Sequence, residues 1–397
     1  MTSTLSGLFD ISLTAPHQAL TVLRTQSPVC RVTLPGDIPV WLVTRHEDVQ
    51  RALTDPRLSN RIPLSDERLA ELVPEDIAHA VNRTMLTVDP PDHTRLRRLV
   101  VSAFTARRIN GLRPRIEEIA DQLATTMSDT DHADLLDSFA FPLPIQVICE
   151  LLGVPMADRA SFRNWSNAAV SGAVDPEGLA PAMTALVGYV RKLVAEKRAE
   201  PADDLLSALI IARDDGDRLS DDELTSMVFL LLVAGHETTV NLIGNGTLVL
   251  LTEPQRWDRL VAEPDLVPGA VEEFLRFESP VQTAGARIAV EPIELGGQLI
   301  PAGDIVLVSL LSANRDPEQF AEPDRFDPTR PTNPHLAFGR GIHFCLGAPL
   351  ARLEGEIAFR TLLRAFPGMR LAVPTGEVPW RPGLTLRGLA SLPVRLK

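Results

Sequence analysis

The strongest constraint on the fold is a long apolar segment at residues 224–251, where His236 and Glu237 are the only residues that are neither apolar nor small and polar. An acidic Asp-Asp-Glu run precedes the segment and favours a helix N-terminus. At about 1.5 Å per residue, this helix would be about 40 Å long. A transmembrane helix has this length, but Glu237 near the midpoint and two asparagines would be costly in lipid. We therefore expect a helix that crosses the core of a large soluble domain.

Around this helix the sequence predicts a mainly α-helical chain with small β-sheets. Apolar residues recur mainly at helical spacing from about residue 92 to residue 280. Short strands are expected in stretches rich in alternating apolar residues: 29–34, 40–43, 288–308 and 371–396. The first two should form a hairpin. No repeat, low-complexity linker or abrupt change of composition divides residues 1–397, so a single domain is expected.

Composition limits the partner and the compartment. The net charge of −13 argues against a nucleic-acid partner over most of the surface. The three cysteines form no CxxC pair, so neither a disulfide framework nor a four-thiolate zinc site is predicted. The N-terminus lacks the basic segment and apolar stretch of a secretory signal. We therefore expect a cytoplasmic protein that binds neither nucleic acid nor membrane.

The centre of the long helix carries residues suited to a bound flat group. In the stretch AGHETT, Ala234 and Gly235 remove bulk, so a flat molecule could lie close to the backbone. Thr238 can return a hydrogen bond to the Ala234 carbonyl, or leave that carbonyl open and bend the helix. A kinked core helix with a hydrogen-bonded Glu237 explains the same residues without a ligand. Both interpretations stay open on this stretch alone.

The stretch FGRGIHFCLG places Cys345 at the start of another predicted helix. Apolar residues follow it at helical spacing, and Pro349 falls in the first turn, where proline is tolerated. The N-terminal end of a helix lowers a thiol pKa and favours the thiolate, which is both a nucleophile and a metal ligand. Gly341 and Gly347 suit turns with positive φ or the close approach of a bulky group.

Three functional interpretations of Cys345 compete with a buried, inert cysteine. A catalytic nucleophile needs a base, and His343 is badly placed unless the loop folds back. A zinc site needs companion ligands, which the stretch lacks. A haem thiolate needs one protein ligand, a flat apolar slot and cations for the propionates. His93 and Arg97, four residues apart on a predicted helix, could hold one propionate, and Arg287 and His343 are further candidates.

Together these motifs resemble a bacterial cytochrome P450 of the soluble, class I type, closest in likeness to actinobacterial members that tailor natural products. FGRGIHFCLG is similar to the family's cysteine loop, and AGHETT resembles its oxygen-activating helix. Arg340 stands where many bacterial relatives carry histidine, a departure that leaves the ligand assignment intact. The resemblance covers nearly the whole chain. It implies a triangular prism with haem between the long central helix and the cysteine-loop helix.

The stretch EEFLR resembles the family's ExxR pair, here Glu273 and Arg276. The irregular segment FAEPDRFDP resembles the one that supplies a third member, here Arg325. The resemblance implies that these residues form a structural ion network. They would matter for haem incorporation rather than for the chemistry, because leaving one buried charge unpaired is expensive.

The resemblance also implies haem b (iron protoporphyrin IX) as cofactor and a role for each site residue. Cys345 would be the axial thiolate ligand of the iron, pushing electron density towards it to favour O–O cleavage. Glu237 and Thr238 would be the acid–alcohol pair that delivers protons, with a mobile Glu237 that reaches bulk solvent. The residues expected to contact the haem are His93, Arg97, Arg287, His343, Phe338, Ala234, Gly235, Gly341 and Gly347.

The activity that the resemblance implies is a monooxygenase that inserts one atom of O2 into a lipophilic small molecule, such as a macrolide, a terpenoid or sterol-like compound or another natural product. Electrons would come from NAD(P)H through a ferredoxin reductase and a ferredoxin. Oxidative cyclisation or bond coupling without net oxygen insertion is an alternative. Peroxide-driven oxidation is disfavoured because Glu237 and Thr238 are both present. A haem-binding sensor or carrier is the alternative from another class.

Two surfaces for partners follow. Seven arginines and no acid between residues 94 and 116 predict a local basic surface, and the resemblance implies that an acidic ferredoxin docks there. A solvated arginine-rich helix explains the same residues. The docking candidates are Arg97, Arg98, Arg107, Arg108, Arg113 and Arg352. By the family's topology, an aliphatic substrate pocket would draw on Leu86, Val233, Ala234, Val281, Thr283, Leu386 and the segment 165–187.

Overall fold

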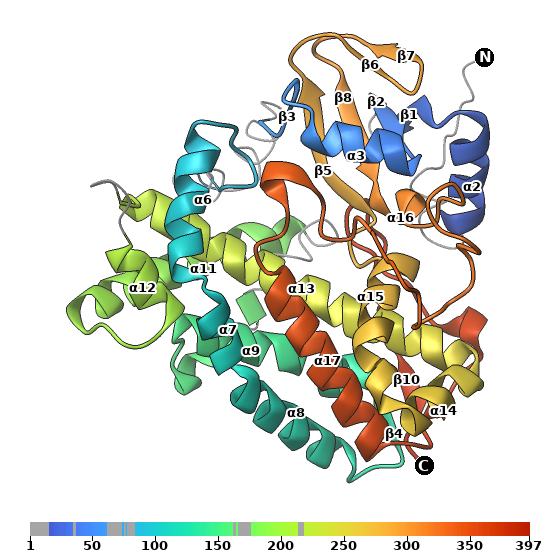
Figure 1. Ribbon diagram of the computed structural model, residues 1–397. Coiled ribbons are helices and arrows are strands. Elements are labelled where there is room, and N and C mark those ends of the chain that lie inside the picture. Colours follow the sequence, from blue (N-terminus) through green and yellow to red (C-terminus); the bar gives the residue numbers. More distant parts are fainter. Residues whose placement is uncertain are drawn as a thin grey trace. The chain divides into compact units, whose positions relative to one another are not determined.

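The computed structural model describes residues 16–34, 37–61, 74, 77, 84–161, 164–165, 176–212 and 218–397 (Figure 1). The chain divides into two compact units. Unit 1 comprises Met1–Ser59, Glu117–Pro142 and Thr238–Lys397, and unit 2 comprises Asn60–Ile116 and Leu143–Glu237. The expectation of a single domain therefore stays a prediction.

Unit 1 contains all the described strands and the helices that flank them. Its strands are β1 Val29–Leu34, β2 Ile38–Val43, β3 Leu58–Ser59, β4 His132–Asp134, β5 Thr283–Ala289, β6 Ile293–Leu295, β7 Gln298–Ile300, β8 Ile305–Ser309, β9 Arg370–Leu371 and β10 Pro393–Arg395. Its helices are α2 Pro16–Gln26, α3 His46–Thr54, η1 Leu136–Ala140, α14 Pro254–Ala262, η3 Pro264–Leu266, α15 Val267–Phe277, α16 Leu310–Ala313, η4 Gly341–His343, α17 Ala348–Ala365 and η5 Thr375–Glu377.

The regular secondary structure in the described residues of unit 2 is helical. Its helices are α6 Asp92–Ala103, α7 Ala106–Gly111, α9 Pro142–Leu152, η2 Met156–Asp158, α11 Pro176–Ala199 and α12 Leu205–Ile211. The boundary between the units falls inside two long helices, α8 Arg113–Met127 and α13 Asp221–Thr252. The predicted class, mainly α-helical with small sheets, is confirmed.

The largest sheet explains the first predicted hairpin. It has five strands in the order β1-β2-β8-β5-β3, and β1 pairs with β2 antiparallel as predicted. Successive residues of a strand face opposite sides. Trp41 and Val43 of β2 therefore join one apolar cluster with α3, while Val40 and Leu42 join another with Leu20 of α2. Figure 1 shows α3 lying along this sheet. Because both faces are covered, β2 is apolar at nearly every position.

The core of unit 1 lies where the second half of α13 meets α15 and α17. A Cβ atom at Gly246 of α13 would lie 2.6 Å from the Phe359 ring and 2.9 Å from the Phe274 ring. These two rings are 4.6 Å apart between centroids. Gly355 of α17 packs tightly on Leu242 of α13, since a Cβ atom there would be 3.1 Å from the Leu242 side chain. The two glycines therefore allow close helix packing.

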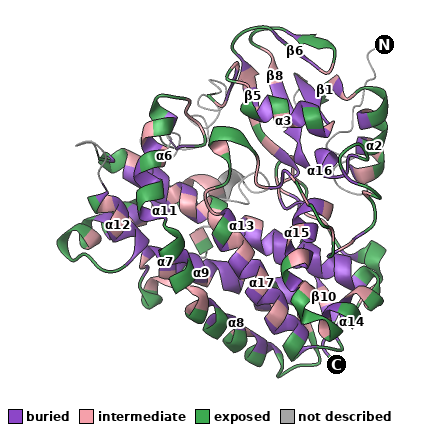
Figure 2. Ribbon diagram, viewed as in Figure 1, coloured by how far each residue is buried: buried purple, intermediate pink, exposed green. Residues whose placement is uncertain are grey.

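The predicted long helix is α13, which begins three residues before the apolar segment and ends one residue after it. It is long and apolar enough to cross a membrane, but 67% of its most apolar window is buried inside the protein. Figure 2 shows the same burial along most of the helix. This is the pattern expected of a core helix, as the two asparagines and Glu237 had indicated.

Glu354 on α17 is a buried acid whose Oε2 has no hydrogen-bond partner among the described residues. Burial raises the pKa of its carboxyl to about 8. The folded protein therefore keeps a proton that the unfolded chain loses above a pH of about 4.5. The preferential binding of this proton by the folded state contributes to the free energy of unfolding. The contribution is complete below the unfolded pKa and is lost as the pH rises through the folded pKa.

We predict that Glu354→Gln removes this pH dependence. Between the two pKa values, the unfolding free energy of the wild type relative to the variant should fall by about 1.4 kcal/mol per pH unit. Urea unfolding at a series of pH values measures the slope. Glu356→Gln on the same helix, which removes the partner of Arg360, is the control and should leave the slope in place. Equal slopes for the wild type and Glu354→Gln would contradict the prediction.

Candidate functional site

The cysteine loop in unit 1 is held by backbone geometry. The Cys345 N–H donates to the Phe338 carbonyl at 2.9 Å, closing the loop that contains η4. Gly341 has a φ of +75°, and a Cβ atom there would lie 3.2 Å from the Leu53 carbonyl of α3. Gly347 is the N-cap of α17, and a Cβ atom there would lie 3.8 Å from the Cys345 Sγ. Gly341 therefore serves the purpose predicted for it through its positive φ, whereas the role predicted for Gly347 stays a prediction.

Cys345 differs from the other two cysteines in its exposure. Cys345 is exposed, Cys30 is half-buried and Cys149 is buried. Burial raises the pKa of the Cys30 thiol and raises that of the Cys149 thiol to about 12. At neutral pH these two cysteines are protonated and inert. Cys345, at the N-terminal end of an 18-residue helix, is the thiol placed to act as a ligand.

Arg287, one of the predicted propionate residues, and the cysteine loop reach the same end of α3. Arg287 of β5 is buried, and its Nη1 donates to the carbonyls of Ala52 and Leu53 at 3.1 and 3.3 Å. Gly341 approaches the same Leu53 carbonyl, and His343 ends the short helix that Gly341 begins. The tertiary structure thus brings a cation from β5 and the start of the His343 turn to the same carbonyl of α3.

Arg340 is tied to α3 as well. In the amide orientation that satisfies both groups, the Gln50 side-chain oxygen accepts from the Arg340 guanidinium at 2.8 Å. The arginine that departs from the family pattern therefore has a partner of its own.

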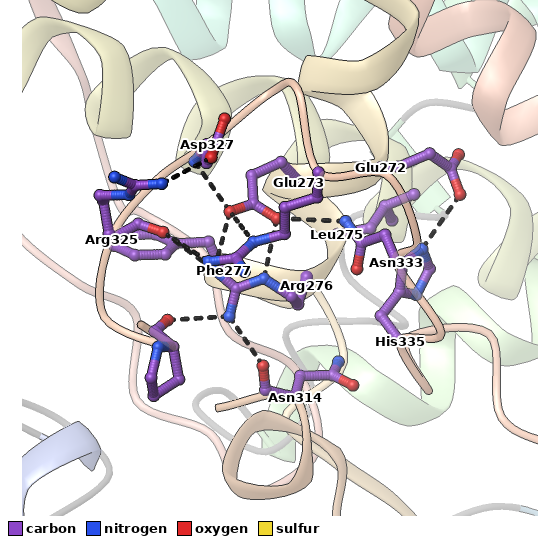
Figure 3. A network of polar contacts seen from close by, with 12 residues as sticks. Glu272, Glu273, Leu275, Arg276, Phe277, Asn314, Arg325, Asp327, Asn333 and His335 are labelled. Atoms are coloured by element: carbon purple, nitrogen blue, oxygen red, sulfur yellow. Dashed lines mark hydrogen bonds and ion pairs between the residues drawn. The ribbon is translucent and has the colours of Figure 1, made fainter. Parts of the chain in front are cut away.

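Glu273 and Arg276 on α15 form a fully buried ion pair (Figure 3). Both Glu273 oxygens accept from Arg276 at 2.8 Å. Arg276 also donates to the carbonyls of Asn314 and Pro323 at 2.9 and 2.8 Å. The Asn333 amide donates to Glu273 at 3.1 Å, so the network ties α15 to the irregular segment that leads to the cysteine loop.

The predicted third member of this network is wrong. The Arg325 side chain is 58% exposed and pairs with Glu322 and Asp327, and only its carbonyl accepts from Arg276. The guanidinium that reaches Glu273 belongs to Arg330, whose Nε lies 3.0 Å from Oε1. The resemblance pointed to an arginine in this segment, but the backbone path decides which arginine faces inward.

In unit 2 the central stretch of α13 has one exposed position. Ala234 is exposed and Val233 is half-buried, among neighbours that are largely buried. The side of Gly235 where a Cβ atom would stand faces Ile148 of α9, 3.4 Å away, rather than the side presented by Ala234. The small residue that leaves room on α13 is therefore Ala234, whereas Gly235 accommodates the neighbouring helix.

The acid of the predicted proton-delivery pair is buried. Glu237 is 4% exposed, and its Oε2 lies 4.0 Å from Nε2 of the buried His236. Nδ1 of His236 lies 2.7 Å from the Leu232 carbonyl, so this nitrogen carries the hydrogen. Glu237 would have to move to exchange protons with solvent, and its mobility stays a prediction. Thr238, the next residue, is half-buried.

The other predicted residues of unit 2 lie on helix α6 and beside it. His93 and Arg97 are on α6, with His93 buried and Arg97 half-buried. Desolvation and the Arg97 charge lower the pKa of His93. Leu86 is 45% exposed.

The predicted docking arginines differ in their engagement. Arg98 and Arg107 are exposed. Arg108 donates to the Asp204 carbonyl at 3.2 Å within unit 2. Arg352, in unit 1, forms a bidentate pair with Glu272 that the sequence reasoning had not found. Four of the candidates are half-buried: Arg97, Arg108, Arg113 and Arg352.

The pocket residues predicted in unit 1 lie together. Val281 pairs with Leu386 in an isolated antiparallel bridge, and both are half-buried. Thr283 is buried and donates its hydroxyl to the Leu384 carbonyl at 2.7 Å. The Thr283 hydroxyl therefore connects β5 to the segment that contains Leu384 and Leu386. Residues 166–175 of the predicted variable segment lie outside the described residues.

The donor set fits a haem better than a zinc ion. One exposed thiol stands at a helix N-terminus, with a buried cation and a histidine joined to its loop through α3. Among the described ranges, no group of three or more His, Cys, Asp or Glu side chains could hold a metal ion. A single protein ligand, as in a haem thiolate, needs no such group.

Comparisons with known proteins agree with this assignment. A family model described as Cytochrome P450 matches residues 178–382. Cytochrome P450 107B1 of Saccharopolyspora erythraea is 51% identical over 379 residues, 93% of this chain and 92% of the relative. Vitamin D(3) 25-hydroxylase of Pseudonocardia autotrophica is 48% identical over 96% of this chain and 94% of the relative. The tirandamycin C-bound P450 monooxygenase TamI is 50% identical, with a TM-score of 0.89 over 98% of both chains.

Proposed function

The chain belongs to the cytochrome P450 family and is a haem-dependent monooxygenase, and we propose that it hydroxylates a lipophilic natural product with electrons from a ferredoxin. The observation that carries this proposal is the exposed Cys345, which lies in a glycine-containing loop just before α17. The two other thiols are less exposed, and burial raises the pKa of each.

The chain's own residues would hold the haem at its iron and at its propionate groups. Cys345 would bind the iron, and Arg287, His343, His93 and Arg97 would neutralise the propionates. When bound, the haem supplies the activation of O2 and the transfer of one oxygen atom to the substrate. Ala234 would leave room for the ring beside the helix backbone, because its methyl group is the smallest side chain that keeps a regular helix.

Glu237 and Thr238 would manage the protons that O2 reduction consumes. The Thr238 hydroxyl can accept a proton from one neighbour and donate one to another. Glu237, buried beside His236, would supply the proton and recover it from water after a side-chain movement. This pair separates a monooxygenase from a haem-binding sensor or carrier, which needs no proton delivery.

We predict that Thr238→Ala uncouples electron supply from product. Without the hydroxyl, proton delivery is no longer directed by Thr238, so most of the reducing equivalents should leave as hydrogen peroxide. The haem content should stay unchanged. Product and hydrogen peroxide per NAD(P)H consumed measure the effect, with Thr239→Ala as the neighbouring control. Unchanged coupling would reject the proton role and favour peroxide-driven oxidation, and wild-type protein that binds haem but never turns over would favour the sensor or carrier.

The substrate class is proposed from the composition of the chain and from its relatives. Val281, Leu386 and Val233 are aliphatic, and aromatics make up 5% of the chain, which suits a lipophilic molecule. The names of two relatives mention vitamin D(3) and tirandamycin C. A library of macrolides, terpenoids and sterol-like compounds, screened by the ligand-induced spin-state change of the haem, tests this proposal. Cyclised or coupled products without a new oxygen atom would favour the alternative outcome.

The redox partner is proposed to be an acidic ferredoxin reduced by an NAD(P)H-dependent reductase, with the protein acting in the cytoplasm. The exposed Arg98 and Arg107 support a basic docking face on unit 2. Electrostatic steering by such a face speeds encounter more than it tightens binding. Arg352 has a different set of contacts.

A further inference from the structure

Arg352 of α17 is engaged on two sides. Its Nε and Nη2 donate to the two oxygens of Glu272 at 2.7 and 2.9 Å, the fork geometry that makes arginine–carboxylate pairs strong. The centre of its guanidinium lies 4.6 Å from the Phe338 ring, a cation–π distance. Phe338 is the residue whose carbonyl accepts the Cys345 N–H at 2.9 Å. One arginine thus joins α15 to the residue that closes the cysteine loop.

His335 contacts the same carboxylate. Its Nε2 lies 3.2 Å from Glu272 Oε2 (Figure 3). Its Nδ1 accepts the Ala337 N–H at 3.2 Å. These partners define the tautomer, because a carboxylate accepts and an N–H donates: the hydrogen is on Nε2. The imidazole and Phe338 rings lie 5.9 Å apart. Glu272 therefore contacts His335, which precedes the cysteine loop, directly. Through Arg352 it is also connected to the ring of Phe338, at the start of the loop.

The charge on Glu272 is well supported. Burial alone would raise the pKa of this carboxyl, but hydrogen bonds from His335 and Arg352 outweigh that effect and hold it at about 2. Glu272 is thus ionised throughout the neutral range. The next residue, Glu273, accepts from Arg276, Arg330 and Asn333, so two successive carboxylates of α15 hold two successive parts of the segment that leads to Cys345.

We infer that Glu272 and Arg352 are positioning residues that fix Phe338, and through it the cysteine loop, against α15 and α17. Arg352 thereby differs from an exposed docking arginine, since its side chain is committed to contacts within unit 1. The inference rests on Cys345 being the iron ligand in the proposed function. The spectrum of the wild-type protein tests that premise separately.

The test compares Glu272→Gln, Arg352→Gln and the double variant as haem-bound proteins. The rate at which the strongly red-shifted, thiolate-type ferrous–CO Soret band is lost on warming measures how firmly the loop holds its ligand. Each single variant should lose the band about tenfold faster than the wild type, the effect of one charged hydrogen-bonded contact. The double variant should lose the band less than about a hundredfold faster, because the two single variants both remove the same Glu272–Arg352 pair and their effects are therefore not additive. Arg352→Lys, which keeps the charge but loses the fork, should be intermediate.

A docking role alone predicts the opposite pattern for the two residues. Arg352→Gln would then lower only ferredoxin-supported turnover, Glu272→Gln would leave or raise it by removing a negative charge, and the CO band would be as stable as in the wild type. That result would overturn the inference. Arg360→Gln, which removes the same charge from a half-buried pair on α17 with Glu356, is the control and should leave the band unchanged. A wild-type protein without the red-shifted band would instead reject the proposed function.

Discussion

Replacing Arg276 with leucine should cost about 3–5 kcal/mol of folding free energy, because it leaves the buried Glu273 carboxylate without its main partner. Arg330→Ala should cost a smaller but clear amount, since it removes one charge-assisted bond to Glu273 and three bonds to backbone carbonyls. Both variants should retain less haem than the wild type after expression. Urea unfolding and the haem-to-protein ratio measure these two effects.

Arg325→Ala is the matched control for this prediction. Its side chain is 58% exposed and pairs only with Glu322 and Asp327, so its loss should change stability by less than about 0.5 kcal/mol. A loss for Arg325→Ala as large as that for Arg330→Ala would contradict the network described here and restore the assignment that the motif had suggested.

Cys345→Ser should abolish monooxygenase activity. The hydroxyl stays protonated at neutral pH, so the iron loses its thiolate ligand, while the side chain keeps nearly the same volume at an exposed position. The dithionite-reduced protein with carbon monoxide should lose the strongly red-shifted Soret band of the wild type. Turnover with reduced ferredoxin should fall to the detection limit.

Cys30→Ser is the control for the thiol itself. Burial raises the pKa of Cys30, so this residue is protonated at neutral pH, and its replacement should preserve both the red-shifted band and turnover. If Cys345→Ser still gave a thiolate-type spectrum, or if Cys30→Ser lost it, Cys345 would not be the ligand.

The two arginines of the irregular segment mark a limit of sequence reasoning. Arg325 and Arg330 lie five residues apart in a stretch without regular periodicity, so no helical or strand pattern says which one faces inward. In the structure the Arg325 carbonyl points inward and accepts a hydrogen bond from Arg276, so the Arg325 side chain points outward. Glu272 was passed over for a related reason: it precedes the motif residue Glu273, and its partners His335 and Arg352 come from distant segments.

What the sequence determined by itself is local. The apolar run predicted α13, alternation predicted the β1–β2 hairpin, and the glycines and the proline around Cys345 predicted a turn that opens α17, because periodicity and backbone preference act over a few residues. Only the tertiary structure decided that Arg330 reaches Glu273, that Gly235 packs on α9 and that Arg352 fixes Phe338. Those contacts join residues far apart in the chain or in irregular segments, and the direction of each side chain there follows from how the elements pack.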